Sequence, residues 1–256
     1  MRILGQPVGR MYITTIILLS SIAAISSYTL RIVPYPLLLA VLVSSLLEIA
    51  IARFHFKRSL RVPYSAIVTG LIIGSIAPPT GSMAIVLVAS AFAVFSKFFI
   101  KMRGSNIFNP AALGLIIALP IFGAGDQWWA ASNYNILGIA VSLTLVLVIT
   151  AYEARRLTAA ASFVLVSLIS TIAIGGISHL SPIGILAAFF SINFYFAFVM
   201  LCEPKTSPNS RYHQIAFGAS IAILYIAIGS LRISYPLLIA LLLGNAAYAL
   251  YRVKRR

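Results

Sequence analysis

Residues 201–213, LCEPKTSPNSRYH, interrupt an otherwise apolar part of the chain with groups that can do chemistry. Glu203, Thr206 and Ser207 place a carboxylate and two hydroxyls in one tight corner. A helix break with such groups is one way in which membrane proteins hold ions or polar ligands near the hydrocarbon. The pair Ser207–Pro208, between Lys205 and Arg211, further predicts the capped start of a following helix.

A second polar stretch, KMRGSNIFNPAALG, begins at residue 101. Asn109 followed by Pro110 predicts a helix N-cap with proline in the first turn. One interpretation is a plain capped helix. The other is a helix N-terminus that faces an anion or an electron-rich ring, with basic side chains beside it. The candidate binding residues of this stretch are Lys101, Arg103, Asn106, Asn109 and Pro110.

Two polar residues lie inside apolar stretches. Glu48, in SSLLEIAIARF, is a candidate cation ligand, because acids inside a membrane span are commonly functional. An ion pair with Arg53, about one turn away, is the interpretation that we favour. Asn193, in FFSINFYFAF, either packs against a neighbouring helix, which we favour, or lines a ring-binding pocket with Phe194 and Tyr195.

The composition defines the class of protein that must position these groups. Hydrophobic residues make up 61% of the chain, charged residues 9%, and the mean hydropathy is +1.03. Such a chain lacks the polar surface of a soluble domain and is typical of a polytopic membrane protein in a lipid bilayer. The chain shows no Walker loop and no nucleophile elbow, so we do not expect nucleotide-driven pumping or hydrolysis.

The charges predict how the chain is oriented. We read about ten apolar spans, and 17 of the 19 basic residues fall in alternate loops and the two ends. The positive-inside rule then places both termini in the cytoplasm of a multi-pass protein of the cell membrane. This distribution explains the net charge of +15 without nucleic acid as a partner. The expected spans are 11–29, 34–52, 64–79, 83–100, 109–123, 134–151, 158–176, 181–201, 213–230 and 235–251.

Two halves of the chain share a pattern. The third span ends in Pro78, Pro79 and Thr80, and five spans later the eighth ends at the Glu203 corner. An odd offset inverts the second copy. We therefore expect one transmembrane domain over residues 1–256, with inverted pseudo-repeats at about 11–123 and 134–251.

Two stretches resemble a known family. TGLIIGSIAPPT together with KMRGSNIFNPAALG, and FYFAFVMLCEPKTSPN further on, are similar to the D subunit of Rnf electron-transport complexes. They are equally similar to the B subunit of the sodium-pumping NADH:quinone reductase. The resemblance implies an all-α fold of ten helices in two inverted five-helix halves, akin to urea transporters. It also implies other membrane subunits as partners.

The resemblance further implies flavin, because family members carry FMN joined through its phosphate to a threonine in a Ser-Gly-Ala-Thr motif. Here the corresponding loop reads GAGDQWWAASNYN and the motif is missing. We expect no covalent flavin, with Ser132 as the one degenerate acceptor. FMN or riboflavin, if present, is expected to be bound non-covalently. We expect Trp128 and Trp129 of this loop to anchor the chain at the outer membrane interface.

These observations leave more than one function open. The leading hypothesis is a non-autonomous subunit of an ion-translocating oxidoreductase complex, which relays electrons through bound flavin, provides the path for Na⁺ or H⁺, or does both. The alternative is a stand-alone channel or carrier for a small solute on the same fold without redox chemistry. A third hypothesis is a scaffold that only docks partner subunits. No residue is singled out as catalytic or as a metal ligand.

Overall fold

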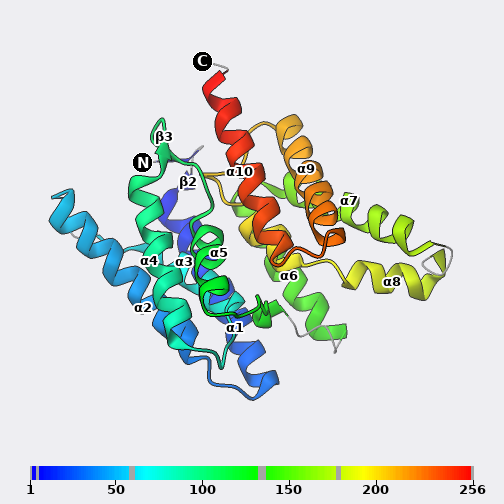
Figure 1. The fold of residues 1–256 in the computed structure, drawn as a ribbon, viewed down its shortest axis with the longest axis horizontal. Helices are drawn as coiled ribbons and strands as arrows, with labels where there is room; N and C mark the ends of the chain where they lie inside the picture. The colour runs from blue at the N-terminus through cyan, green and yellow to red at the C-terminus, as the bar shows by residue number, and fades with distance from the viewer. Residues whose placement is uncertain (1, 4–5, 58–60, 132–136, 177–179, 255–256) are drawn as a thin grey trace. The chain divides into compact units, whose positions relative to one another are not determined.

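The computed structural model describes residues 2–3, 6–57, 61–131, 137–176 and 180–254. The chain forms two compact units, residues 1–135 and 136–256. Figure 1 shows the first unit from blue to green and the second from green to red. The boundary between them lies next to the expected start of the second repeat.

Helices make up almost all of the first unit, and their breaks follow the prolines and polar runs of the sequence. A five-residue π-helix, η1, continues α2 without a break. The helices are α1 (Val8–Leu30), α2 (Tyr35–Ala50), η1 (Ile51–His55), α3 (Tyr64–Ile76), α4 (Met83–Phe99), α5 (Pro110–Ile121) and the 3₁₀ turn η2 (Trp129–Ala131).

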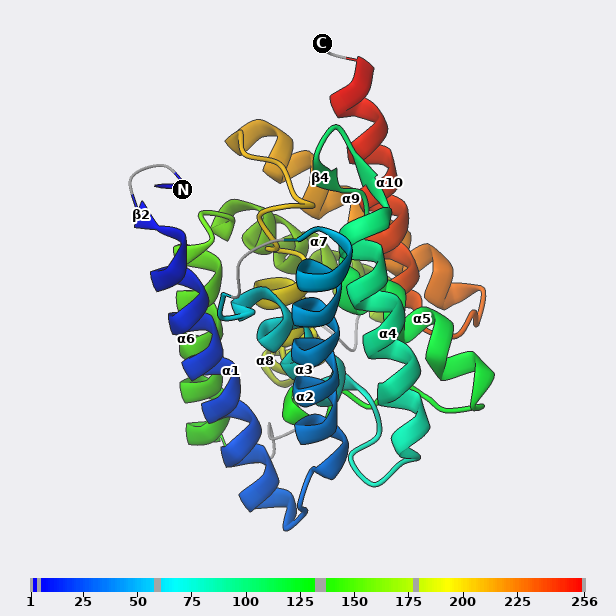
Figure 2. The same ribbon diagram turned by 90° about the vertical axis from the view of Figure 1, so that its left-hand side faces the viewer.

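Small residues let the helices of the first unit approach closely. Helix α3 packs on α1 and α2, and α4 packs on α2 and α5 (Figure 2). A Cβ atom at Gly70 would lie 2.5 Å from the Cα of Val41. A Cβ atom at Gly114 would clash with the main-chain oxygen of Ala89. These glycines therefore set the contact distances between α2 and α3 and between α4 and α5.

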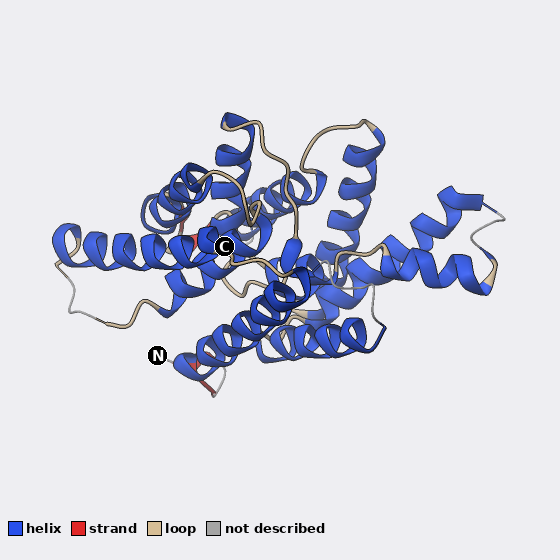
Figure 3. Cartoon of the chain, turned by 90° about the horizontal axis from the view of Figure 1, so that it is seen from below, coloured by secondary structure: helices blue, strands red, loops and turns tan. Residues whose placement is uncertain are grey.

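The strands are short. They form two antiparallel hairpins, β1 (Arg2–Ile3) with β2 (Gln6–Pro7) and β3 (Lys101–Met102) with β4 (Ser105–Asn106), drawn red in Figure 3. Arg103 and Gly104 at the tip of the second hairpin have φ of 52° and 78°. Positive φ at both central residues is the requirement of a type I′ turn, which glycine meets without strain. This hairpin leads the chain from the end of α4 toward the start of α5.

The second unit is also helical. Helix α7 packs on α9 and on α8, and α9 packs on α10. A Cβ atom at Gly218 in α9 would clash with the main-chain oxygen of Ala159 in α7, so this pair too is in backbone contact. The helices are α6 (Leu137–Glu153), α7 (Leu157–Gly175), α8 (Pro182–Phe190), the π-helix η4 (Phe196–Met200), α9 (Arg211–Ser230) and α10 (Pro236–Lys254).

The expected continuous span 181–201 is wrong. Helix α8 ends at Phe190, residues 191–193 are not helical, and helical structure resumes at Phe194 before η4. The side-chain oxygen of Asn193 accepts a hydrogen bond of 2.8 Å from the main-chain nitrogen of Phe196. This asparagine therefore accepts from a main-chain N–H group in the first turn of the second segment, as N-cap residues do.

The predicted class, an all-α membrane protein, is confirmed. Among the residues that the structure describes, five helical stretches are long and apolar enough to cross a bilayer: Gly9–Leu30, Tyr35–His55, Leu157–Gly175, Arg211–Ser230 and Pro236–Lys254. Shorter apolar helices include Tyr64–Ile76, Met83–Phe99 and Pro110–Ile121. The short helices end at prolines or polar loops, and these ends carry most of the candidate site residues.

Candidate functional site

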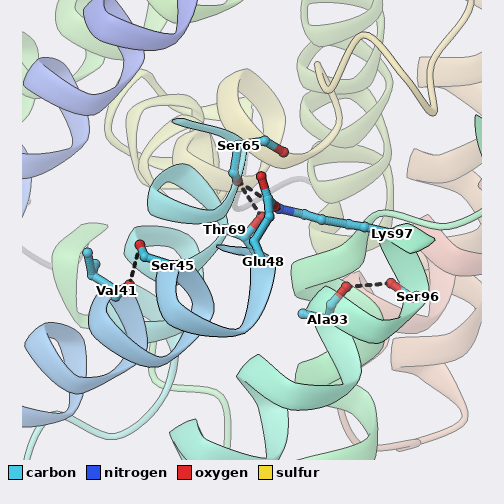
Figure 4. Close-up of polar contacts among 8 residues, drawn as sticks. All are labelled: Val41, Ser45, Glu48, Ser65, Thr69, Ala93, Ser96 and Lys97. Atoms are coloured by element: carbon cyan, nitrogen blue, oxygen red, sulfur yellow. Dashed lines mark hydrogen bonds and ion pairs between the residues drawn. The ribbon is translucent and has the colours of Figure 1, made fainter. Parts of the chain in front are cut away.

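The first polar site lies where three helices of the first unit meet (Figure 4). The ammonium nitrogen of Lys97 in α4 lies 3.1 Å from the carboxylate oxygen Oε2 of Glu48 in α2. The same ammonium donates a hydrogen bond of 2.9 Å to the main-chain oxygen of Ser65, in the first turn of α3. The two charged side chains are only 8% and 19% exposed. A charge pair with these bonds ties α2, α3 and α4 together at one end of the unit.

The predicted partner of Glu48 is therefore wrong, because Lys97 takes the place that we assigned to Arg53. Arg53 lies in η1 and is exposed. Lys97 reads in the sequence as one more basic residue at a helix end, and it does lie in the last turn of α4, but its side chain is buried. Thr69, one turn along α3, also donates to the oxygen of Ser65, at 2.8 Å. Oxygen atoms thus gather around this ammonium.

The Lys101–Pro110 stretch has the local structure that the sequence predicts. The side-chain oxygen of Asn109 accepts a hydrogen bond of 3.0 Å from the main-chain nitrogen of Ala112, and Pro110 is the first residue of α5. Asn106 and Asn109 are buried, whereas Lys101 and Arg103 are exposed. The predicted cap is confirmed. A ligand role for these five residues stays a prediction.

The corner after η4 is held by a buried arginine. Arg156, between α6 and α7, donates from Nε to the hydroxyl of Ser207 at 2.9 Å and from Nη2 to the side-chain oxygen of Asn209. Nη2 also reaches the main-chain oxygen of Pro204 at 3.4 Å. Burial lowers the pKa of this guanidinium from its usual value. The side chain makes no ion pair with any carboxylate that the structure describes.

The main-chain oxygens of the same corner accept hydrogen bonds from other groups of the protein. The oxygen of Glu203 accepts from the hydroxyl of Ser207 at 2.6 Å and from two main-chain nitrogens. The oxygen of Thr206 accepts from Asn245 in α10 at 3.4 Å. The oxygen of Asn209 accepts from Gln214 in α9 at 3.2 Å. The corner is therefore fixed from three sides by the start of α7 and by α9 and α10.

The expected helix start at Ser207–Pro208 is wrong. Helix α9 begins at Arg211, and the hydroxyl of Ser207 is engaged with Arg156 and Glu203 rather than with the first turn of α9. The sequence did not single out Arg156, because it looks like its exposed neighbour Arg155. Asn245 and Gln214 were also missed. A lone amide inside the apolar run LLLGNAAYAL was the available signal for Asn245.

The loop that corresponds to the family's flavin-bearing loop performs a structural role where it is described. Trp129 is buried, and its ring nitrogen donates 2.7 Å to the main-chain oxygen of Gly74 near the end of α3. It is therefore not the exposed interfacial anchor that the sequence predicts. Trp128 donates to Asp126 at 2.7 Å, and burial raises the pKa of that carboxyl despite this hydrogen bond.

This loop does not fit a covalently attached flavin. Residues 122–131 contain no serine or threonine to form a phosphate ester, and the buried face of Trp129 is occupied by α3. Ser132, the degenerate acceptor, lies outside the described residues. We therefore derive no step through a covalent flavin.

The candidate residues fall in both units. Glu48 and the Lys101–Pro110 group lie in the first unit, and the first unit brings Glu48 onto Lys97. Asn193, Glu203, Thr206 and Ser207 lie in the second, where Glu203, Thr206 and Ser207 share one turn and Asn193 caps the segment that leads to it. Each unit thus buries polar groups at a place where a helix is interrupted or joined to its neighbours.

Apolar helices with buried charges and amides between them define an integral membrane protein with polar sites inside its helical units. A sequence model of the NQR2, RnfD, RnfE family matches residues 4–187, and the chain belongs to this family. Its members are membrane subunits of Rnf- and Nqr-type ion-translocating oxidoreductase complexes. The resemblance predicted from the sequence is confirmed.

One similar protein is the D subunit of the ion-translocating oxidoreductase complex of Pseudomonas paraeruginosa (strain DSM 24068 / PA7). It is 37% identical over 87 residues, which are 30% of this chain and 25% of that relative. The match therefore spans about a quarter of the relative's length.

Proposed function

We propose that this protein is a membrane subunit of an Rnf/Nqr-type redox complex and that it takes part in the electron-driven movement of Na⁺ or H⁺. The observation that carries the proposal is the family match over residues 4–187. The Pseudomonas relative supports the same function, since its name describes ion-translocating oxidoreduction. On this proposal the chain acts with other membrane subunits rather than alone.

The packing within each unit supports an internal repeat. In the first unit α2 packs on α4, α4 on α5, and α1 on α3. In the second, α7 packs on α9 and α9 on α10, which are the same pairs five helices later, and α6 packs on η4, the segment that follows α8. We propose that the units are two copies of one five-helix motif, inverted by the odd number of crossings. Ten crossings then leave both termini in the cytoplasm.

The Glu48–Lys97 site is our candidate for ion handling. A carboxylate inside apolar helices is costly unless it is paired, and such acids commonly mark ion paths. Here the pairing cation is part of the chain, and the carbonyl of Ser65 and the hydroxyl of Thr69 are beside it. Glu48→Gln is expected to shift the dependence of complex activity on the coupling ion, while an unchanged dependence would leave the pair a structural clamp.

Flavin, if this protein holds it, would be FMN or riboflavin bound without a covalent link. The starts of helices favour electron-rich groups, and the capped start of α5 at Asn109 lies close in the chain to the basic hairpin Lys101–Asn106. We propose this segment as the one to test. Asn109→Ala removes both the cap and the amide, whereas Asn109→Ser keeps a capping oxygen and serves as the control for helix stability.

The alternative function is a channel or carrier for a small solute on the same fold. Its support is specific, because the loop of residues 122–131 lacks a flavin acceptor and Trp129 secures it to α3. On this alternative the chain would transport a solute without redox partners.

An absorbance spectrum of the gently purified protein, followed by fluorescence of its band in a denaturing gel, separates these functions. Flavin absorbance with a dark band is the expected result and means non-covalent flavin. A fluorescent band would show covalent attachment and direct mutation to Ser132. Absence of flavin both from the isolated chain and from the native assembly would favour the solute channel.

A further inference from the structure

The end of α2 carries an exposed group of aromatic and basic side chains. The chain continues from α2 into η1, and Arg53, Phe54, His55, Phe56 and Lys57 are all exposed. Phe54 is 82% exposed. A π-helical turn changes the direction of the side chains that follow it, and such turns are frequent at functional positions.

These aromatic side chains meet those at the end of α4. The rings of Phe56 and Phe98 stack with centroids 5.4 Å apart, and those of His55 and Phe99 meet edge to face at 5.5 Å. The ammonium of Lys101 lies 5.7 Å from the centroid of Phe98. Rings from both helix ends therefore form one surface, which we call the aromatic–basic end: residues 53–57, Phe95, Phe98, Phe99 and Lys101.

The charge of this surface is not balanced from within the unit. Residues 1–135 contain two acids, Glu48 and Asp126. Glu48 is paired with Lys97. Asp126 lies in the loop that binds the opposite end of α3, next to Trp128. Arg53 and Lys57 form no ion pair with a described residue, so the aromatic–basic end presents a surplus of positive charge.

An apolar stripe leads to this end along α4. Phe92, Phe95 and Phe99 are 44%, 48% and 46% exposed and recur at helical spacing on one face. The rings of Phe95 and Phe99 stack at 4.4 Å. Since Phe99 also contacts His55, the stripe is continuous with the charged surface.

We propose that the aromatic–basic end binds an anionic phospholipid, with its phosphate near Arg53, Lys57 and Lys101 and an acyl chain along the phenylalanines of α4. The surface matches both ends of the ligand. Its surplus of basic side chains suits the phosphate, and the exposed phenylalanines of α4 suit the acyl chain. Basic residues at headgroup level attract anionic lipids, and phenylalanine side chains offer apolar contacts to an acyl chain. The acyl chain of a zwitterionic lipid would contact the same phenylalanines, but its headgroup has no net charge to neutralise the basic side chains. This proposal does not depend on the redox function.

Native mass spectrometry of the detergent-purified protein, titrated with phosphatidylglycerol or phosphatidylcholine, tests the proposal. The wild-type protein is expected to retain phosphatidylglycerol preferentially. Replacing Arg53, Lys57 and Lys101 together by glutamine should weaken that binding on the order of 100-fold, since each basic residue near an anionic surface contributes roughly fivefold. Binding of phosphatidylcholine should change little.

A matched variant in the second unit controls for net charge. Arg155, Arg211 and Lys254, all exposed, are replaced together by glutamine, which removes the same charge elsewhere. This control should keep its preference for phosphatidylglycerol, and both variants must keep the wild-type melting temperature within a few degrees. Equal loss in the two variants, or equal binding of the two lipids by the wild type, would overturn the proposal. Phe98→Leu should weaken binding of phosphatidylglycerol without altering net charge. If none of these effects on lipid binding is seen, the surface would instead be assigned to the binding of a partner protein.

Discussion

Lys97 and Glu48, 49 positions apart in the chain, form an ion pair of 3.1 Å, and the same lysine bonds to the main chain of α3. Three helices are therefore joined by two charged side chains in an apolar setting. Neither charge can be lost alone without leaving the other in surroundings of low polarity.

Lys97→Met is expected to destabilise the protein by roughly 3–5 kcal/mol, because it leaves the Glu48 carboxylate without its cation. Lys97→Met combined with Glu48→Gln should recover much of that loss. Thermal unfolding in one detergent measures both. Equal stability of Lys97→Met and the double variant would show that the unpaired Glu48 carboxylate is not what destabilises Lys97→Met.

Arg156→Gln should loosen the corner of residues 203–209, because the guanidinium holds Ser207, Asn209 and the oxygen of Pro204. Cys202 is the single cysteine of the chain, is 2% exposed, and bonds through its thiol to the main chain of Arg156. Its alkylation by a maleimide in native membranes therefore reports opening of this corner.

We expect Cys202 to react at least several times faster in Arg156→Gln than in the wild type. Arg155→Gln, a change of the exposed neighbour, is the matched control and should react at the wild-type rate. Arg156→Lys should resemble Arg156→Gln, because an ammonium cannot reproduce the fork of the guanidinium. An unreactive cysteine in every variant would mean that other contacts hold the corner.

Trp129→Phe should lower stability by about 1–3 kcal/mol, since the main-chain oxygen of Gly74 would lose its indole donor while staying buried. Trp128→Phe is the comparison, because its indole bonds to the half-buried Asp126 rather than to a buried main-chain oxygen. The melting temperature should fall more for Trp129→Phe. A larger fall for Trp128→Phe would contradict the role given to Trp129 in holding the end of α3.

Gly114→Ala should separate α4 from α5, because the new methyl group would clash with the main-chain oxygen of Ala89. Overpacking of this kind costs about 1–3 kcal/mol. Gly125→Ala meets nothing within 4 Å and is the control. Comparable melting temperatures for the two variants would show that α4 and α5 can move apart without cost.

The features that the sequence could predict are those that depend on residues close together in the chain. The cap at Asn109–Pro110 depends on residues three apart and was found, as was the apolar class of the helices. The pairing of Glu48 with Lys97 depends on how α2 and α4 pack, so the nearer Arg53 was chosen instead. The break in α8 was missed because FFSINFYF is apolar almost throughout and lacks proline. Arg156 could not be distinguished from Arg155, since burial separates them and charge does not.

The most direct test of the central claim is affinity purification of the tagged chain from its own membranes under mild conditions, with redox-driven ion movement measured in vesicles of the same cells. The account predicts that other membrane subunits of an ion-translocating oxidoreductase co-purify in fixed ratio and that Glu48→Gln alters the coupled ion movement. A chain that purifies alone, and whose deletion leaves electron-driven ion movement intact, would contradict it.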